Sequence, residues 1–307
     1  DWARALGPPL FAGRIRAQPA DFVVVEELDI DLSGDGEHDW LWIEKTGANT
    51  HWVAEQLAGH AGVSPRDVGY AGLKDRHAVT RQWFSVRRPS VDGTDWDTFT
   101  ADGVVTLDRR RHSRKLKRGA HRGNQFRIAI RAMEIVESSA AVNDRLTAIK
   151  EKGVPNYFGE QRFGRDGSNV ALGQAVVEGR RVPRHKRSIG LSAVRSFQFN
   201  ETLDERVRDG SWDRLLPGDV ANLDGTGSVF AVDELTSDLE RRCAEMDIHP
   251  CGLLPEIPKA RVTASHRPLR LRVRDLRWET EADALWLEFR LGRGSYATAV
   301  LREIASL

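Results

Sequence analysis

Residues 68–83 read Val-Gly-Tyr-Ala-Gly-Leu-Lys-Asp-Arg-His-Ala-Val-Thr-Arg-Gln-Trp, and this stretch is the most informative part of the chain. Its apolar first part, Val68 to Leu73, predicts a strand, and a dense set of charged and polar side chains follows directly. Gly69 and Gly72 weaken a strand, so they indicate places where another group approaches the backbone closely.

Asp75 lies in this stretch between Lys74 and Arg76. Cationic neighbours favour the ionised form of a carboxyl group. An ionised Asp at the end of a strand can act as nucleophile or base. An ordinary solvated turn has the same composition, and the spacing of these residues alone favours that simpler interpretation.

The rest of the chain predicts β-rich ends around a mixed middle. We expect strands at 10–17, 21–28, 39–45, 82–87, 124–131, 219–222, 228–232, 269–280 and 284–291. We expect helices from Asn49 or Thr50 to Gly59, as a short turn at Ser64-Pro65, and at 134–152, 169–178, 192–208 and 236–246. A final helix carries Ala297, Val300, Leu301 and Ile304 on one face.

Length, composition and charge limit the classes of protein to which this chain can belong. The 307 residues favour two domains, and 30% charged with 40% hydrophobic residues is compatible with a buried core. The net charge of +1 means that a nucleic-acid surface has to be local. No apolar run is long enough to span a bilayer. Cys243 and Cys251 form no CxxC pair, so we expect a reduced, cytoplasmic environment. The nine histidines are scattered, so we expect no metal site.

Four further segments accompany the 69–82 stretch in a fixed order. They are residues 19–26 (Pro-Ala-Asp-Phe-Val-Val-Val-Glu), 122–126 (Arg-Gly-Asn-Gln-Phe), 153–164 (Gly-Val-Pro-Asn-Tyr-Phe-Gly-Glu-Gln-Arg-Phe-Gly) and 294–303 (Gly-Ser-Tyr-Ala-Thr-Ala-Val-Leu-Arg-Glu). Together the five segments resemble the signature of the TruD family of tRNA pseudouridine synthases. One short motif is weak support, but five motifs in order cover nearly the whole chain.

The resemblance implies an α+β fold. Residues 1–152 plus 267–307 would form a pseudouridine-synthase catalytic domain with a mixed or antiparallel sheet and helices. Residues 153–266 would form an inserted α/β TRUD domain. We expect the aromatic residues of 156–164 to pack at the junction between the two.

The resemblance also implies a reaction. A family member isomerises uridine 13 of tRNA to pseudouridine by breaking the bond from N1 to C1′ and forming one from C5 to C1′. This needs no cofactor or metal, but it needs a carboxylate near the sugar. By resemblance that carboxylate is Asp75, which would attack C1′ or remove a proton from C2′.

Five further residues are expected at the substrate site by the same resemblance. Phe22 and Phe126 lie on alternating strands, where core packing is the default interpretation, and Asn124 is by default a turn residue. Two of the five depart from the family. Tyr296 replaces the usual Phe and adds a hydroxyl, and Arg16 stands where the family tends to have Lys. Arg16 keeps the charge, but a guanidinium does not reproduce an ammonium.

Basic clusters suggest how a nearly neutral chain meets RNA. Residues 109–118 hold seven Lys or Arg, a density suited to phosphate, although a charge run is usually a solvated face. The candidates for RNA-backbone contacts are Arg110, Arg114, Lys115, Lys117 and Arg118. The expected insertion has its own cations at 180–181, 184–187 and Arg195.

Two other classes of function stay open. One is a non-catalytic RNA-binding or RNA-folding protein that uses the same surfaces. The other is an Asp-dependent nucleosidase or glycoside hydrolase, which needs a second carboxylate; Glu26 and Glu303 are its candidates. For the preferred interpretation, tRNA is the partner, and we expect a monomer with no obligate protein partner and no membrane association.

Overall fold

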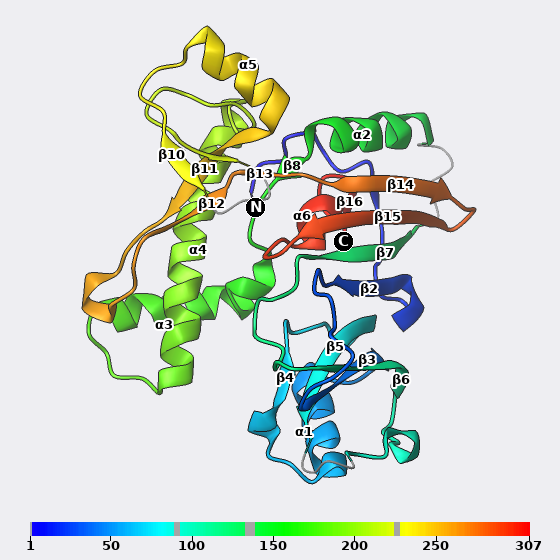
Figure 1. The fold of residues 1–307 in the computed structure, drawn as a ribbon. Coiled ribbons are helices and arrows are strands. Elements are labelled where there is room, and N and C mark those ends of the chain that lie inside the picture. Colours follow the sequence, from blue (N-terminus) through cyan, green and yellow to red (C-terminus); the bar gives the residue numbers. More distant parts are fainter. Residues whose placement is uncertain (1, 89–92, 133–138, 224–227) are drawn as a thin grey trace. The chain divides into compact units, whose positions relative to one another are not determined.

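The computed structural model describes residues 2–88, 93–132, 139–223 and 228–307. Figure 1 shows its helices and strands. They form two compact units. One unit comprises 11–139, 274–294 and residue 307, and the other comprises 1–10, 140–273 and 295–306. Within the described residues, no helix combines the length and the apolar character that a bilayer crossing requires. The expected α+β fold is confirmed.

The unit that contains residues 11–139 is built on one large mixed sheet. Its strands run in the order β14 (Arg274–Thr280), β15 (Ala284–Gly292), β7 (Gly123–Arg131), β2 (Phe22–Glu27), β5 (Val79–Arg87), β3 (His38–Thr46) and β6 (Val104–His112). Strand β4 (Val68–Tyr70) also pairs with β5. The β2–β5 pair is parallel and the other pairs are antiparallel.

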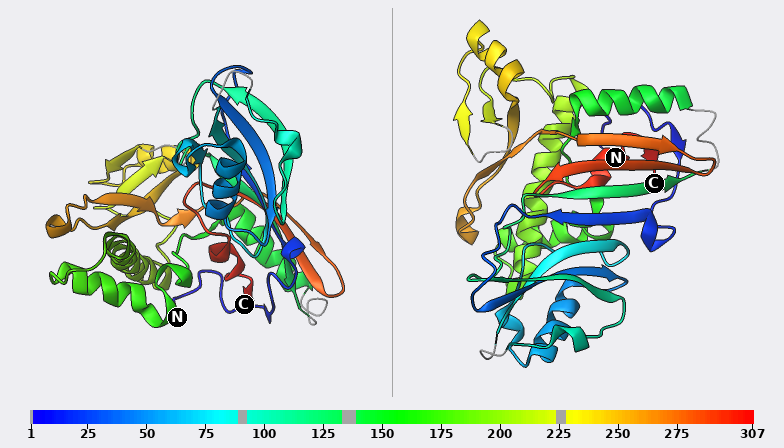
Figure 2. Two further views of the ribbon diagram at one scale, coloured as in Figure 1. Left: turned by 90° about the horizontal axis from the view of Figure 1, so that it is seen from below. Right: turned by 45° about the vertical axis from the view of Figure 1, so that its right-hand side comes forward.

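Helix α1 (Thr50–Ala61) lies on one face of this sheet (Figure 2). Its apolar residues, among them Val53 and Leu57, pack against Leu41, Ile43 and Phe84 of the strands. The helix ends at Gly62, whose φ of 66° is left-handed and suits a residue without Cβ.

The close approach expected at the two glycines of the opening stretch is present at Gly69, whereas a Cβ at Gly72 would come no closer than 3.3 Å, to the His121 ring. A Cβ at Gly69 would lie 2.3 Å from the carbonyl oxygen of Leu116 and 2.7 Å from Ser85 Oγ. The group that approaches this strand is therefore the chain after β6. Ser85 Oγ also accepts a hydrogen bond from the Leu116 N–H at 2.8 Å.

One expectation for this unit was wrong, and one of its strands was not expected. The strand expected at 10–17 is only β1 (Phe11–Ala12), and the left-handed φ of 59° at Arg16 is incompatible with an extended strand through residue 17. Strand β6 was not expected at all. It is an edge strand whose Val105 and Leu107 are exposed, so it lacks the apolar alternation that predicts a half-buried strand.

The other unit contains five of the α-helices in the described part of the chain, and its sheets have fewer strands than the large sheet described above. The helices are α2 (Ser139–Lys152), α3 (Ser168–Val177), α4 (Arg184–Arg208), α5 (Ser237–Met246) and α6 (Ala297–Leu301). An antiparallel sheet has the order β10 (Val229–Ala231), β9 (Val220–Leu223), β11 (Ile248–Leu254) and β12 (Ser265–Pro268), and β8 (Val154–Pro155) pairs with β13 (Arg270–Leu271). Strand β16 is Ala305–Ser306.

The expected helices and the expected 219–222 and 228–232 strands of this unit are confirmed in type and corrected in extent. Residues 134–138 of the expected 134–152 helix lie outside the described residues, and the helix ends at Lys152 as expected. The final helix is shorter than its pattern, since Ile304 follows α6 although it is fully buried. The expected 269–280 strand is divided into β13 and β14. Strand β11 was missed because Pro250 argues against a strand; its two halves pair with different neighbours.

Helices α3 and α4 cross where both have glycine. A Cβ on Gly173 would lie 2.1 Å from the Gly190 carbonyl oxygen, and a Cβ on Gly190 would lie 2.7 Å from the Gly173 nitrogen. Tyr157, Phe158 and Phe163 are buried with Phe199 in a cluster along α4. The aromatic residues of 156–164 thus form part of this unit's core.

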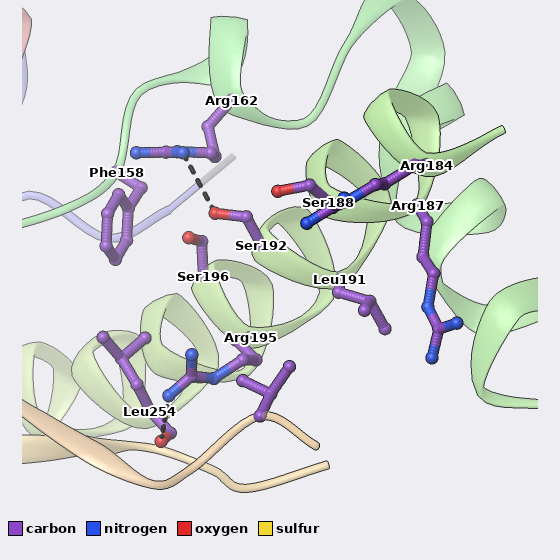
Figure 3. Close-up of a pocket in the computed structure, with 11 residues that line it drawn as sticks. Phe158, Arg162, Arg184, Arg187, Ser188, Leu191, Ser192, Arg195, Ser196 and Leu254 are labelled. Atoms are coloured by element: carbon purple, nitrogen blue, oxygen red, sulfur yellow. Dashed lines mark hydrogen bonds between the residues drawn. The ribbon is translucent and has the colours of Figure 1, made fainter. Parts of the chain in front are cut away.

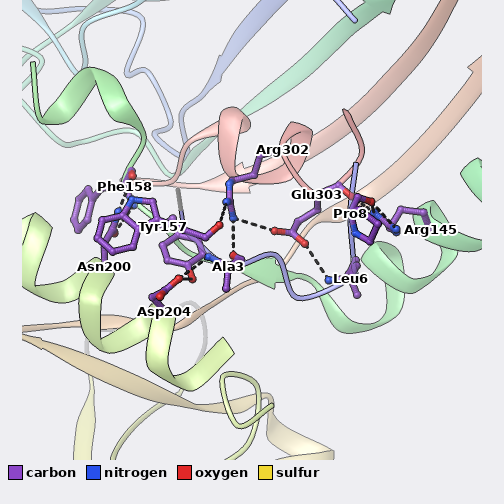
Figure 4. Close-up of polar contacts among 11 residues, drawn as sticks. Ala3, Leu6, Pro8, Arg145, Tyr157, Phe158, Asn200, Asp204, Arg302 and Glu303 are labelled. Carbon is purple, nitrogen blue, oxygen red and sulfur yellow. Dashed lines mark hydrogen bonds and ion pairs between the residues drawn. The ribbon is translucent and has the colours of Figure 1, made fainter. Parts of the chain in front are cut away.

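Glu303 anchors the N-terminal segment of the same unit (Figure 4). The Leu6 N–H donates to its Oε2 at 3.1 Å, and Arg302 Nη1 lies 3.2 Å from its Oε1. Arg145 donates to the Glu303 carbonyl and to the Pro8 carbonyl. Burial raises the pKa of the Glu303 carboxyl, and the nearby arginines oppose that shift. Glu303 is therefore a buried structural carboxylate.

The expected insertion of residues 153–266 lies within this second unit, which also includes 140–152, 267–273 and both terminal segments. The unit bounds therefore differ from the domain bounds expected from the sequence, and the assignment of 153–266 as an inserted domain stays a prediction.

Candidate active site

Asp75 lies in the loop after β4 with hydrogen-bond or ionic partners on both carboxylate oxygens. Arg16 Nη2 lies 2.6 Å from its Oδ2, and the His77 N–H donates to its Oδ1 at 3.0 Å. The side chains of Arg16 and Asp75 are 30% and 32% exposed. The carboxylate is thus oriented on both sides and still accessible.

The cation that contacts Asp75 is not one of its sequence neighbours. Arg76 donates from Nε to the Gly47 carbonyl at 3.0 Å, and Lys74 Nζ contacts Glu26 and Asn124. Lys74 and Arg76 therefore direct their charged groups to other partners, and the cation in contact with the Asp75 carboxylate is Arg16. Sequence adjacency places successive side chains in different directions, whereas Arg16 reaches the carboxylate through the fold.

The backbone at Asp75 is held by a buried lysine that sequence reasoning missed. Lys45 Nζ donates to the carbonyls of Asp75 and Ala48, each at 2.8 Å, and its side chain is fully buried. Burial lowers its pKa to about 8, helped by the Lys74 charge and opposed by Asp75. The signal in the sequence was a Lys at the inward position that follows Leu41 and Ile43 on β3.

Further hydrogen bonds hold the loop before Asp75. Thr50 Oγ1, at the start of α1, accepts from the Lys74 N–H at 2.9 Å and donates to Gln82 Oε1 at 3.2 Å. Gln82 Nε2 in turn donates to the Gly72 carbonyl at 3.1 Å. The loop is therefore attached to both α1 and β5.

Lys74 joins two strands beneath the loop. Its Nζ lies 2.8 Å from Glu26 Oε2 on β2 and donates to Asn124 Oδ1 on β7 at 2.8 Å. Burial raises the pKa of Glu26, while the Lys74 charge and hydrogen bond oppose that shift. Asn124, expected at the substrate site, thus contacts Lys74, the residue that precedes Asp75 in the chain.

Phe22 and Phe126 are buried, as core packing predicts. Their rings meet edge to face at 6.4 Å, and Phe126 stacks on Phe289 at 5.3 Å. The Arg16 guanidinium carbon lies 4.2 Å from the Phe22 ring centroid. The flat guanidinium therefore covers a face of Phe22 and contacts Asp75 at the same time.

The remaining substrate-site candidate, Tyr296, belongs to the other compact unit. Its hydroxyl accepts a hydrogen bond from Arg162 Nη2 at 2.5 Å, and its ring lies 6.0 Å from that of Phe158. This supplies the partner of the hydroxyl by which the chain departs from the family. A role for Tyr296 beside Asp75 stays a prediction.

The five basic candidates for RNA contacts lie on and after β6 and are exposed. Arg110 Nε pairs with Asp108 Oδ2 at 2.9 Å, and Lys115 donates to the Arg66 carbonyl. Arg118 lies over the Tyr70 ring at 3.5 Å. No ion pair to a described residue engages Arg114 or Lys117.

A second catalytic carboxylate is not found at either expected position. Glu26 is buried against Lys74, and Glu303 is buried in the other unit. Across the described ranges, no three His, Cys, Asp or Glu side chains converge as metal ligands would.

Comparison with known proteins identifies relatives for most of the chain. Residues 6–181 and 222–304 match the family model described as tRNA pseudouridine synthase D (TruD). The chain is 43% identical to the tRNA pseudouridine synthase D of Methylococcus capsulatus, over 99% of this chain and 94% of that protein. It is also 43% identical to that of Nitrosococcus oceani, over 97% and 91%. A crystal structure titled as the putative tRNA pseudouridine synthase D of Methanosarcina mazei superposes with a TM-score of 0.78 at 20% identity, covering 98% of this chain and 95% of that one.

Proposed function

Because this chain belongs to the tRNA pseudouridine synthase D (TruD) family, we propose that it is an isomerase that converts uridine 13 of tRNA to pseudouridine. Asp75 is the catalytic residue of this proposal. The observation that carries it is the Asp75 carboxylate, which is one-third exposed and held by Arg16 and the His77 N–H. A group fixed before the substrate arrives avoids the entropic cost of orienting it during the reaction.

Isomerisation of uridine to pseudouridine requires one carboxylate near the ribose. Asp75 either attacks C1′ as N1 leaves, which forms an ester, or removes the C2′ proton as N1 leaves, which forms a glycal. In both cases the uracil turns and C5 bonds to C1′ while the ester breaks or C2′ regains its proton. The C5 proton is then lost and N1 is protonated. Lys45 fixes the Asp75 backbone, and Arg16 fixes one carboxylate oxygen. Glu26 and Asn124 act on the site through Lys74.

A uridine inside folded tRNA has to leave its stack, which costs about a few kcal/mol. Single-stranded bases stack on aromatic rings or on the planes of Arg guanidinium groups. Since Arg16 covers a face of Phe22, its guanidinium offers such a plane next to Asp75. The Phe22 ring, backed by Phe126, then supports the base indirectly.

The surface after β6 supplies phosphate contacts in this proposal. Arg114 and Lys117 are its first candidates because both are exposed and lack an ion-pair partner among the described residues. Arg110, Lys115 and Arg118 already have protein partners and would have to share or exchange them. We also propose that residues 153–266 are the inserted domain that grips tRNA.

The proposal is tested by replacing Asp75 with Asn, which keeps the size of the side chain and removes the nucleophile or base. Mass mapping of pseudouridine on bulk tRNA, from cells that lack the protein and express the variant, should show none at position 13. The matched control is Asp31→Asn, the same change at an exposed loop carboxylate, which should restore the modification. Parent-level pseudouridine with Asp75→Asn would reject Asp75 as the catalytic residue.

The same proteins separate the other functions. A non-catalytic RNA-binding protein would leave position 13 unmodified with the parent chain and would still bind tRNA. A nucleosidase would release uracil from free uridine. We expect the parent to modify tRNA and to leave free uridine intact.

A further inference from the structure

A basic pocket lies in the second compact unit, and its lining residues all belong to that unit. It encloses about 470 Å³, within the range of about 300–1,000 Å³ that is usual for ligand sites. Figure 3 shows Phe158 and Arg162 at one end and Arg184 and Arg187 at the other. Leu191 and Leu254 supply apolar wall between these ends.

Helix α4 builds most of the pocket from two adjacent rows of side chains. Residues 184, 188, 192 and 196 form an Arg-Ser-Ser-Ser row, and residues 187, 191 and 195 form an Arg-Leu-Arg row. Residues four apart lie above one another on a helix, so both rows line the same hollow. The glycine crossing with α3 includes Gly190 of the same helix.

The positive charge of the pocket is not neutralised by the protein. Among the residues that the structure describes, none of Arg162, Arg184, Arg187 and Arg195 forms an ion pair with a carboxylate. The first turn of α4 contains no acidic residue, although the N-terminus of a helix is already electropositive and cations there are unfavourable. An anion bound in the pocket would remove this conflict.

A hydroxyl inside the pocket also lacks a partner. Ser196 is only 2% exposed and lines the hollow, and its side chain makes no hydrogen bond to any described residue. Ser192 Oγ, one turn earlier, accepts a hydrogen bond from Arg162 Nη1 at 3.0 Å. The Nε of the lining residue Arg195 is buried without a hydrogen-bond partner among the described residues. Buried polar groups are normally satisfied, so this N–H indicates a bound molecule with an acceptor atom.

A second hollow of about 560 Å³ continues the basic surface. It shares Arg184 and Arg187 with the first pocket and adds Lys259 and Arg261. A free nucleotide needs one phosphate site, whereas two hollows joined by shared arginines suit successive phosphates of a chain.

We propose that this pocket and the adjoining hollow bind a phosphodiester segment of RNA, with one nucleotide seated between Phe158 and Arg187. Arg184 and Arg187 contact its phosphates, and Leu191 and Leu254 contact its base or ribose. The identification of the ligand as RNA rests on the proposed function. The site itself rests on the cavity, the unneutralised arginines and the buried, unpartnered Arg195 Nε.

The first test removes charge. The pair Arg184→Gln and Arg187→Gln is compared with Arg241→Gln and Arg242→Gln on α5, which are exposed cations outside both hollows. Binding of a tRNA transcript is titrated at several salt concentrations in the Asp75→Asn background, so the result does not depend on turnover. We expect the pocket pair to weaken binding about tenfold or more and to flatten the salt slope by up to about 1.4–1.8, at about 0.7–0.9 per contact. Equal slopes for the two pairs would overturn the proposal.

The second test fills the cavity without changing charge. Ser188→Phe places a ring at the pocket, and Ile189→Phe is its control at the next, exposed position. We expect Ser188→Phe alone to weaken tRNA binding. An effect of the arginine pair without an effect of Ser188→Phe would reject the pocket in favour of diffuse surface charge.

The third test measures binding of AMP, which asks whether the pocket holds a free nucleotide instead of RNA. Binding of AMP that Ser188→Phe abolishes, with unchanged tRNA affinity, would assign the pocket to a free nucleotide and overturn the RNA proposal. If the parent makes no pseudouridine while these binding differences are found, the proposed function fails and the RNA site stands.

Discussion

Arg16 Nη2 lies 2.6 Å from Asp75 Oδ2, and the same guanidinium lies over the Phe22 ring with its central carbon 4.2 Å from the ring centroid. Arg16 reaches this place with a φ of 59°, a left-handed conformation that costs a non-glycine residue on the order of 1–3 kcal/mol. Because strained backbone persists where the surroundings impose it, this strain supports a functional position for the guanidinium.

Replacing Arg16 with Gln should slow pseudouridine formation at saturating tRNA by about ten- to one-hundred-fold. A hydrogen bond to a charged group contributes about 1.5–3 kcal/mol, and each 1.36 kcal/mol is about tenfold in rate. Arg16→Lys should stay closer to the parent because it keeps the positive charge. Single-turnover rates measure both, and a Gln variant as fast as the parent would exclude Arg16 from orienting Asp75.

Lys45 should make stability depend on pH above 8. Burial lowers its pKa from 10.5 to about 8, so between these values the unfolded chain binds more protons than the native one. The free energy of unfolding therefore gains a contribution that rises with pH across this window and is absent below it. Denaturant titrations from pH 7.5 to 10.5 should show this rise in the parent and lose it in Lys45→Met. The exposed Lys150→Met serves as control and should keep the parent slope.

Breaking the buried Lys74–Glu26 ion pair should lower the free energy of unfolding far more than breaking an ion pair at the surface. Lys74→Met leaves Glu26 buried without its cation, which typically costs about 3–5 kcal/mol, whereas the double variant with Glu26→Leu should recover much of that loss. Arg110→Met breaks an exposed pair with Asp108 and should cost about 1 kcal/mol or less. Chemical denaturation compares the three variants. Equal losses for Lys74→Met and Arg110→Met would contradict the buried ion pair.

The surface after β6 should contribute to the salt dependence of tRNA binding. Changing Arg114 and Lys117 to Gln should lower the slope of log affinity against log salt by up to about 1.4–1.8, at about 0.7–0.9 per phosphate contact. The chemical step at saturating tRNA should be nearly unchanged, because Asp75 and its partners are left in place. Lys150→Gln with Lys152→Gln on α2 is the matched control. An unchanged slope would show that this segment is only a solvated face.

Much of the local structure could be predicted from the sequence. The apolar alternation of 124–131, the Ser64-Pro65 turn and the Gly153 stop depend on neighbours within a few residues, and each appears as expected. The order of five motifs pointed to the family and to Asp75, and the family is confirmed. The edge strand β6 was not predicted because an exposed strand does not require alternating apolar and polar residues.

Only the tertiary structure decided which side chains meet. Asp75 contacts Arg16 instead of the adjacent cations, and its carbonyl is held by Lys45 from another strand. The physical reason is that strand pairing and helix packing join distant residues, and a buried charge takes whichever partner the fold provides. The pocket along α4 arises in the same way. The arginines and serines of α4 are visible in the sequence, but only the folded structure shows that both rows of side chains line the same pocket.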